Sequence, residues 1–429
     1  MEQGKITHGS KRAFALVFLT WLVYSMSYLG KVNYSANISE IIEFYGITKS
    51  EAGIVSSFFF LSYGAGQVFN GLFCKKYNIK WIIFTSLILS ACINLAVGVS
   101  YDFSIIKWLW LLNGFLLSML WPTLIRLLSE ELPKEKLSTA CGVMGTTVAI
   151  GTLTVYALSS LFVSFDKFKL SFYTAGIVVI IVAFIWILLF GKIVKNSGAK
   201  ECTDKNNEEN KDENTLIEDE KKAEHKLLYV TICTLCFFAI GVNLIKDGLT
   251  TWVPSILQEE FSVSDSLSIL LTLFLPVLAV FGNILALKMH KMIPDYISHC
   301  GTVFTIIAIL IIAITGSLSF EVISLMLVGL ITVNFLASSL NNLITSMFPL
   351  FMRGKVNSGM IAGVLNGFCY LGSALSSYGL GKIADNFGWG TVFDTLMALC
   401  ALFVATWIVY LCYKRYIKKY KKWGEKNNE

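Results

Sequence analysis

Residues 21–35 read WLVYSMSYLGKVNYS and end an apolar run that begins at residue 13. A run of this length can cross a bilayer as a helix. Lys31 lies near its end, and a charge at that depth costs about 2.5–3.5 kcal/mol on insertion scales, so such a residue usually faces water or a partner. Tyr24, Tyr28, Lys31 and Ser35 share one helix face. This face suits an oxygen-rich anion, while the alternative is a lysine that extends to the nearer membrane interface.

The composition of the whole chain is that of a membrane protein. Hydrophobic residues make up 55% of the 429 residues, charged residues only 15%, and the mean hydropathy is +0.65. We therefore predict an all-α integral membrane protein with twelve transmembrane helices. The twelve uncharged runs are 13–30, 52–74, 81–101, 108–125, 137–165, 170–191, 227–245, 266–287, 296–320, 322–352, 356–381 and 395–413.

Lysine and arginine are distributed unevenly among the loops between these runs. Because cytoplasmic loops carry the excess of basic residues, the sequence predicts that both termini are cytoplasmic and that the protein lies in the plasma membrane. The basic tail, residues 414–429, should lie against anionic lipid headgroups, so the net charge of +6 gives no indication of nucleic-acid binding. With this orientation the basic residues outside are Lys49, Lys107, Lys167, Lys169 and Lys382.

A polar stretch, residues 195–225, divides the twelve runs into six and six. It is rich in charge and asparagine and poor in large apolar residues, which predicts a flexible cytoplasmic linker. We expect a six-helix bundle over residues 1–194, this linker, a second six-helix bundle over residues 226–413, and the basic tail.

The two halves align at an offset of 216 residues, which brings Lys31 within one residue of Lys246. If a two-fold axis along the membrane normal relates the halves, as in transporters with parallel repeats, the two lysines face each other across a central cavity. Two ammonium groups would repel each other there unless an anion enters between them. Asp247 is adjacent to Lys246 but turned by about 100° on the helix. Ordinary ion-paired or interfacial lysines are the alternative.

Polar and small residues in other runs are open to two interpretations. Tyr63 and Gln67 lie one helical turn apart, as do Asn366 and Tyr370. Each pair either lines the cavity or makes hydrogen bonds between helices. Several glycines are expected to permit close helix packing. They are Gly142, Gly145, Gly363, Gly367 and Gly372.

No pattern typical of an enzyme stands out. Ten cysteines and four histidines are present, but no pair of cysteines combines with histidines at a metal-ligand spacing. Cys233 and Cys236 form a CxxC inside an apolar run, where small packing residues are expected. Without a nucleophile–base pair, a metal cluster or a glycine-rich phosphate loop, we predict neither catalysis nor a bound metal or cofactor.

Four stretches together resemble the major facilitator superfamily, and within it the organophosphate:phosphate antiporters, such as bacterial glycerol-3-phosphate and hexose-phosphate transporters. The resemblance covers nearly the whole chain apart from the linker and tail. It implies the major facilitator fold, two pseudo-symmetric bundles of six helices. The four stretches are YLGKVNY at 28–34, SMLWPTLIR at 118–126, KDGLTTWVPSIL at 246–257 and AGVLNGFCYLGSALSSYGLGKIADNFGW at 362–389.

The resemblance also implies a substrate site. In that family one arginine of the first helix and one of the seventh hold the phosphate, and the matching positions here are Lys31 and Lys246. Lysine acts as a point charge where arginine binds phosphate with two parallel hydrogen bonds, so a carboxylate or a smaller phosphate ester stays open as substrate. The tyrosines of the family's cavity fall on Tyr24, Tyr28, Tyr63 and Tyr370.

Other positions of the family pattern differ in this chain. Gln67 stands where the family has a cavity lysine, Val148 where it has a histidine, and Asn243 where it has a tyrosine. The loop GLFCKKYNIK resembles the superfamily's GxLxDRxGRR, with Cys74 in place of the acid. The gating contacts of that acid are therefore not expected here.

We predict a secondary active transporter that moves a small organic anion, a phosphate ester or a carboxylate, by alternating access. Anion exchange, with inorganic phosphate as a counter-ion, is favoured by the resemblance. Proton symport with Asp247 as the coupling residue is the alternative, as is a transporter-like sensor that binds the anion and signals. We expect a monomer in the lipid bilayer. The expected substrate-binding residues are Lys31, Lys246, Tyr24, Tyr28, Tyr63, Gln67 and Tyr370.

Overall fold

The structure is a computed structural model that describes residues 11–73, 77–194, 215–279, 281–320, 322–352 and 358–426. Within these ranges all regular secondary structure is helical. Cys74 and residues 195–214 of the expected linker lie outside the described residues. The helix that follows begins at Thr215, inside the segment that we predicted to be a linker.

The described part of the N-terminal half contains ten helices, and some consecutive helices belong to the same membrane crossing. The first crossing breaks at Tyr28, and the fourth breaks at Met119, three residues before Pro122, whose ring and missing N–H interrupt a helix. The helices are α1 (Lys11–Ser27), α2 (Leu29–Ala36), α3 (Ile38–Tyr45), α4 (Lys49–Phe73), α5 (Ile79–Val99), α6 (Phe103–Ser118), α7 (Leu120–Glu131), α8 (Lys134–Gly145), α9 (Thr147–Val163) and α10 (Lys169–Ile193).

The C-terminal half also combines interrupted and continuous helices, and two of its helices, α11 and α18, are much longer than the others. One of them, α18, is divided by a non-helical residue at Gly388. A π-helical turn, η2, precedes Pro349, consistent with a proline that disturbs the turn before it. The elements are α11 (Thr215–Phe261), α12 (Asp265–Thr272), α13 (Phe274–Ala279), α14 (Gly282–Met292), α15 (Tyr296–Ser319), α16 (Ile323–Asn342), η2 (Leu343–Met347), α17 (Phe348–Phe351) and α18 (Ser358–Lys426).

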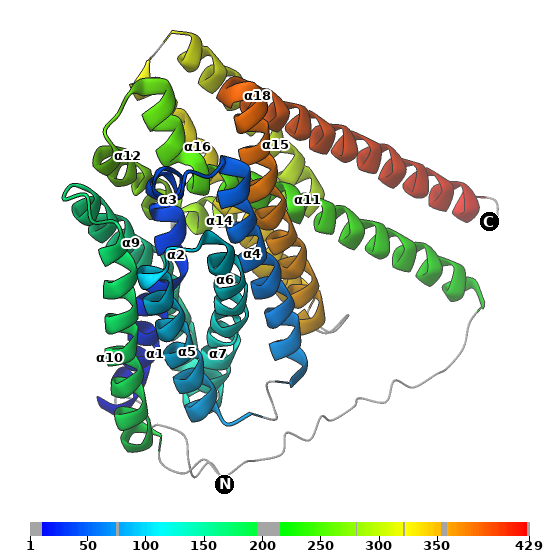
Figure 1. Ribbon diagram of the computed structural model, residues 1–429. Coiled ribbons are helices and arrows are strands. Elements are labelled where there is room, and N and C mark those ends of the chain that lie inside the picture. The colour runs from blue at the N-terminus through cyan, green and yellow to red at the C-terminus, as the bar shows by residue number, and fades with distance from the viewer. Residues whose placement is uncertain are drawn as a thin grey trace.

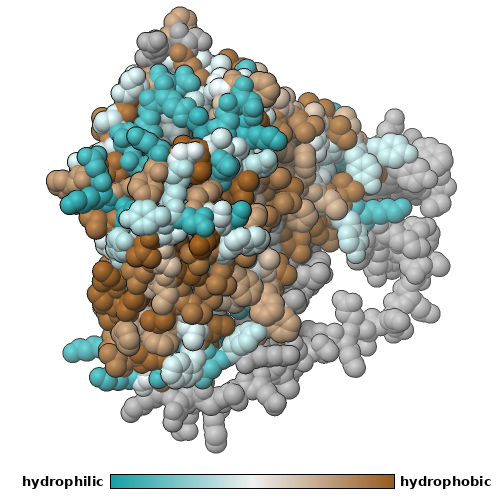
Figure 2. Space-filling view, in the orientation of Figure 1, coloured by the Kyte–Doolittle hydropathy of each residue, from teal (hydrophilic) through white to brown (hydrophobic). Residues whose placement is uncertain are grey.

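The helices are long and apolar enough to cross a bilayer many times. Ten stretches meet this condition in the described residues, or eleven if the bent pair of α12–α13 and α14 forms one span. One of the ten, Ile361–Ile417, is 57 residues long and contains the break at Gly388, so it carries the last two predicted segments. Figure 2 shows a broad hydrophobic band on the surface with hydrophilic residues above and below it. The all-α membrane fold is confirmed, and the count of twelve is reached only when α18 is divided and the bent pair of α12–α13 and α14 is counted as one span.

The two halves lie side by side, with α4 of the first half running along α18 of the second (Figure 1). Ser39 Oγ and Ser255 Oγ are 2.9 Å apart, and these residues are separated by 216 positions, the offset that aligns the halves. Residues that are equivalent under a two-fold rotation contact each other only close to the axis. This contact therefore supports the pseudo-two-fold relation.

The halves make polar contacts at the end of the molecule where α4 begins, which is the outside in the predicted orientation. Asp385 of α18 accepts hydrogen bonds from the backbone N–H groups of Lys49 and Ser50, at 3.0 and 2.7 Å. Lys49 Nζ lies 3.1 Å from the carboxylate of Glu259, which also accepts from the indole of Trp389. We call this contact region between α4, α11 and α18 the outer seam.

Close backbone packing continues the outer seam toward the centre of the molecule. A Cβ on Gly53 would lie 2.2 Å from the carbonyl oxygen of Ser377, so only glycine allows this approach. One turn further, Ser57 Oγ donates to the carbonyl oxygen of Ala374 at 2.6 Å. The outer seam thus closes one end of the space between the halves.

Candidate functional site

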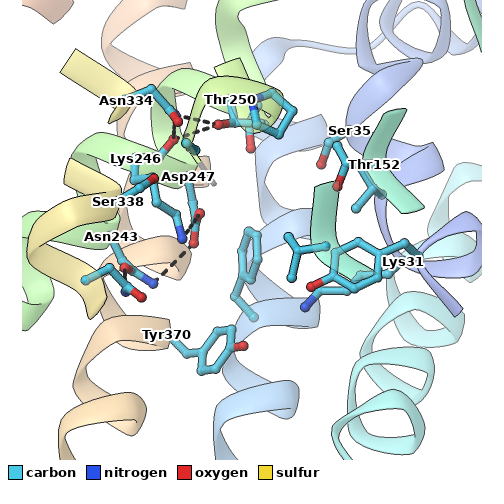
Figure 3. A pocket seen from close by; sticks show the side chains of 18 of the residues that line it. Lys31, Ser35, Thr152, Asn243, Lys246, Asp247, Thr250, Asn334, Ser338 and Tyr370 are labelled. Atoms are coloured by element: carbon cyan, nitrogen blue, oxygen red, sulfur yellow. Dashed lines mark hydrogen bonds and ion pairs between the residues drawn. The ribbon is translucent and has the colours of Figure 1, made fainter. Parts of the chain in front are cut away.

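A cavity of about 370 Å³ lies between the two halves, below the outer seam. Its volume is within the range of pockets for small organic ligands. Figure 3 shows Lys31, Ser35 and Thr152 of the N-terminal half on one side, and Lys246, Asp247 and the asparagines of the C-terminal half on the other. Gly145 of α8 and Ser346 of η2 line the cavity toward the opposite end of the molecule.

Lys31 lies in the first turn of α2, which buried asparagines of neighbouring helices hold in place. Next to it, the carbonyl oxygen of Gly30 accepts hydrogen bonds from the side-chain amides of Asn113 and Asn94, at 2.7 and 3.4 Å. Asn33 Nδ2 donates in turn to Asn94 Oδ1 at 2.8 Å. These buried amides of α5 and α6 hold the turn of α2 that carries Lys31 in place.

The Lys31 ammonium lies among aromatic rings from both halves. Its Nζ is 4.1 Å from the ring centre of Tyr63, 5.3 Å from that of Tyr28 and 5.9 Å from that of Tyr370. Within the described part of the chain no carboxylate lies within ion-pair distance of it. Cation–π attraction stabilises an ammonium in such a place but leaves its charge uncompensated. Lys31 is thus available to an anion.

Lys246 on α11 is in a different situation. Its Nζ lies 3.2 Å from Asp247 Oδ1, although the sequence suggested that the two residues point in different directions. The four-carbon stem of lysine is flexible enough to bring the ammonium to the neighbouring carboxylate. Asp247 Oδ2 also accepts from Ser373 Oγ and, at 3.3 Å, from Asn243 Nδ2. The expected repulsion between two bare ammonium groups is therefore absent.

Asparagines of the C-terminal half form a polar wall that the sequence reasoning missed. Asn334 Nδ2 donates to the carbonyl oxygen of Lys246 and to Thr250 Oγ1, at 3.1 and 3.0 Å, and Asn341 Nδ2 donates to Asn243 Oδ1. The wall residues on α16 and η2 have the spacing i, i+4, i+7 and i+11, the same as that of the polar face of the first helix. This polar stripe in the sequence could have indicated the wall. It consists of Asn334, Ser338, Asn341 and Thr345.

The predicted site residues divide into two groups. Five line the cavity: Tyr28, Lys31, Lys246, Asp247 and Tyr370. Three are not among its lining residues: Tyr24, Tyr63 and Gln67. Tyr24 packs edge-on against the Tyr28 ring at 5.6 Å, and Tyr63 contacts Lys31. Gln67 Oε1 accepts a hydrogen bond from Asn366 of the other half. Gln67 therefore makes a hydrogen bond between helices, which was the alternative to a place in the cavity wall.

Comparisons with known proteins agree with this architecture. The sequence model of the Major Facilitator Superfamily matches residues 20–377. A "Probable hexose phosphate transport protein" of Chlamydia trachomatis is 23% identical over 92% of this chain and 90% of that protein. The glycerol-3-phosphate transporter of Bacillus subtilis is 22% identical over 94% of this chain and 93% of that protein.

Solved structures share the fold. A bacterial homologue of the human lysosomal transporter Spinster, in an inward-facing and occupied conformation, superposes with a TM-score of 0.74 at 13% identity, covering 94% of this chain and 97% of that one. These similar proteins are transporters, not enzymes. The family match, the helical membrane fold and the cavity between two related halves show that the chain belongs to the major facilitator superfamily.

Proposed function

We propose that the chain is a secondary active transporter that exchanges a small organic anion, a phosphate ester or a carboxylate, across the plasma membrane. One observation carries the proposal: Lys31 and Lys246, from equivalent helices of the two halves, line opposite sides of one cavity (Figure 3). The names of the relatives, which refer to hexose phosphate and glycerol-3-phosphate, support an anionic substrate.

The geometry also supports alternating access. With both termini in the cytoplasm, the orientation that we propose, the outer seam closes the cavity on the outside and the lining residues of α8 and η2 lie toward the inside. Rocking of one half against the other about the site would open the seam. The structure then corresponds to the inward-facing state of the cycle.

Exchange is favoured over proton symport by the contacts of Asp247. This carboxylate faces the Lys246 ammonium and accepts from two further side chains. A proton on Asp247 would remove the ion pair and leave Lys246 uncompensated, at a cost in a membrane interior. In an exchanger no group of the cavity needs to change its charge, and the uncompensated Lys31 holds back reorientation of the empty carrier.

Counterflow in proteoliposomes tests the proposal. Vesicles that contain the purified protein are preloaded with unlabelled glucose 6-phosphate, glucuronate or inorganic phosphate, and uptake of the labelled anion is followed with and without a pH gradient. We expect uptake that requires a preloaded anion and is indifferent to the pH gradient, in the wild type and in Asp247→Asn alike. Gradient-driven uptake into empty vesicles that Asp247→Asn abolishes would establish symport, and binding without any flux would establish a sensor.

An acidic cluster beside the outer seam, next to the contact of Ser39 with Ser255, should make closure of the seam dependent on pH. Glu40 and Glu43 of α3 and Asp265 of α12 have carboxylate oxygens within 4.8 Å of one another. Glu40 follows the first spanning stretch, which ends at Ala36. Burial, together with the nearby carboxylates of Asp265, Glu43 and Asp166, raises the pKa of Glu40 to about 7 from an ordinary value of 4.5.

If opening of the seam returns the pKa of Glu40 to its ordinary 4.5, the closed state binds the proton more tightly, so lower pH should favour closure over the range from about 7 to 4.5. Closure can be measured as disulfide formation between Ser39→Cys and Ser255→Cys, whose Oγ atoms are 2.9 Å apart in the native pair. Thiol chemistry itself varies with pH, so the same pair in a Glu40→Gln background is the control. Equal pH dependence in both backgrounds would contradict the assignment.

A further inference from the structure

The charged side chains that line the cavity carry a net charge of +1, which would balance a singly charged anion but not a doubly charged one. Of the described lining residues, three are charged at neutral pH: Lys31, Lys246 and Asp247. Lys246 and Asp247 neutralise each other at 3.2 Å. The described lining residues therefore have a net charge of +1, which is located at Lys31 on the N-terminal side.

The ion pair is built into the C-terminal half. Asp247 is held from three directions, by Lys246, by Ser373 of α18 and by Asn243 one turn earlier on α11. Asn243 is only 3% exposed and is itself held by Asn341. A substrate that displaced Asp247 to reach Lys246 would have to break these contacts and leave a carboxylate uncompensated. Lys246 thus serves as a hydrogen-bond donor with two N–H bonds to spare rather than as a second bare cation.

The remaining polar groups of the cavity are neutral and lie mostly on the C-terminal side. The lining residues Asn243, Asn334, Asn341, Asn342 and Asn366 all come from that half. The side chains of Ser338 and Asn342 have no protein hydrogen-bond partner within the described ranges, so both side chains are available to a ligand. Carboxamides and hydroxyls at a cavity wall recognise the hydroxyl groups of a substrate, because both can donate and accept hydrogen bonds.

We infer that the cavity selects a polyhydroxylated organic anion with a single negative charge, whose anionic group binds Lys31 and whose hydroxyl groups bind the asparagine wall. This inference rests on the proposed function and narrows its substrate class. A singly charged carboxylate leaves the loaded cavity neutral. A phosphate monoester above its second pKa of about 6 carries nearly two charges and leaves it negative by one, which is unfavourable in a low-dielectric interior.

Four probes separate charge from hydroxyl content: glucuronate, glucose 6-phosphate, hexanoate and glucose. Their dissociation constants can be measured by thermal shift on the purified, full-length protein. At about pH 8, where the phosphate monoester is almost wholly dianionic, we expect glucuronate to bind at least about tenfold more tightly than each of the other three. Tighter binding of glucose 6-phosphate at this pH would overturn the inference while the proposed function stands.

The pH dependence of the wild-type protein gives a test without any variant. Between about pH 8 and pH 5.5 the singly charged fraction of glucose 6-phosphate rises about 75-fold, given a second pKa near 6. Its affinity should rise with that fraction, whereas glucuronate keeps one charge and serves as the reference. A constant ratio of the two affinities over this range would contradict the inference.

Variants connect the selectivity to the named residues. Asp247→Asn raises the cavity charge to two, so the preference for glucuronate over glucose 6-phosphate should fall at least about tenfold. Asp394→Asn makes the same change at an exposed position of α18 and should leave the preference intact. Asn342→Leu should weaken the binding of glucuronate but not that of hexanoate, which has no hydroxyl groups. If Asp247→Asn leaves the preference unchanged, the charge argument is wrong, and if none of the anions binds or exchanges, the proposed function itself fails.

Discussion

Replacement of Lys31 by alanine should reduce counterflow of the anion by at least about 30-fold, because truncation of one partner of a buried ion pair costs about 2 kcal/mol or more. Lys31 is the lining cation without an ion-pair partner among the described residues, so the variant cavity has no net charge. Initial rates in proteoliposomes with equal amounts of protein measure the effect. Lys167→Ala, an exposed lysine outside the cavity, is the matched control.

Variants of Lys246 test whether exchange depends on the net charge of the cavity or requires two ammonium groups. Lys246→Ala alone leaves Asp247 uncompensated and should abolish exchange as Lys31→Ala does. The double variant Lys246→Met with Asp247→Asn restores a net charge of one, and part of the activity should return. Wild-type flux in Lys31→Ala would refute the role of that lysine, and a double variant as inactive as Lys246→Ala would show that the second ammonium itself is needed.

Substitution of Gly53 by alanine should prevent closure of the outer seam. The added Cβ would lie 2.2 Å from the Ser377 carbonyl oxygen and 2.8 Å from its carbon, and both are backbone atoms of a helix that cannot move aside locally. Each half can still fold, but the inward-facing state becomes inaccessible. We expect at least about a tenfold loss of exchange, since overpacking of a tight contact costs about 1–3 kcal/mol.

Two measurements separate a blocked seam from a misfolded protein. Disulfide formation between Ser39→Cys and Ser255→Cys should be lost in the Gly53→Ala background, while thermal unfolding of the detergent-solubilised protein changes little. Gly363→Ala is the matched control, because a Cβ there meets no atom within 4 Å. Normal crosslinking together with normal exchange in Gly53→Ala would show that the seam does not close as tightly as described.

The membrane spans and the relation between the two halves could be predicted from the sequence, because they depend on the distribution of apolar and charged residues along the whole chain. Apolar runs separated by charged loops predict the spans, and the offset of 216 residues places Lys31 and Lys246 on equivalent helices. The contact of Ser39 with Ser255 at that same offset supports the alignment. These features are insensitive to the exact path of any one helix.

Features that depend on local geometry were not predictable. Tyr24 shares a helix face with Lys31 in sequence spacing, but it packs against Tyr28 and Trp121 and is not among the residues that line the cavity. The expected packing glycines Gly142, Gly145, Gly363 and Gly367 have open space around them, whereas Gly372 and the unexpected Gly53 make close contacts. Which glycine meets a neighbour depends on the rotation of two helices about their axes, and composition does not determine it.

The ion pair of Lys246 and Asp247 also determines how the carrier responds to the membrane potential. Because the pair is neutral, Lys31 gives the empty cavity its single net charge among the described lining residues. Transfer of one elementary charge through the full membrane field is worth about 2.3 kcal/mol per 100 mV. In the proposed orientation, a membrane that is negative inside should therefore draw the empty carrier toward the inward-facing state. A bound monoanion should cancel this bias, and we expect the loaded carrier to reorient at a rate independent of voltage.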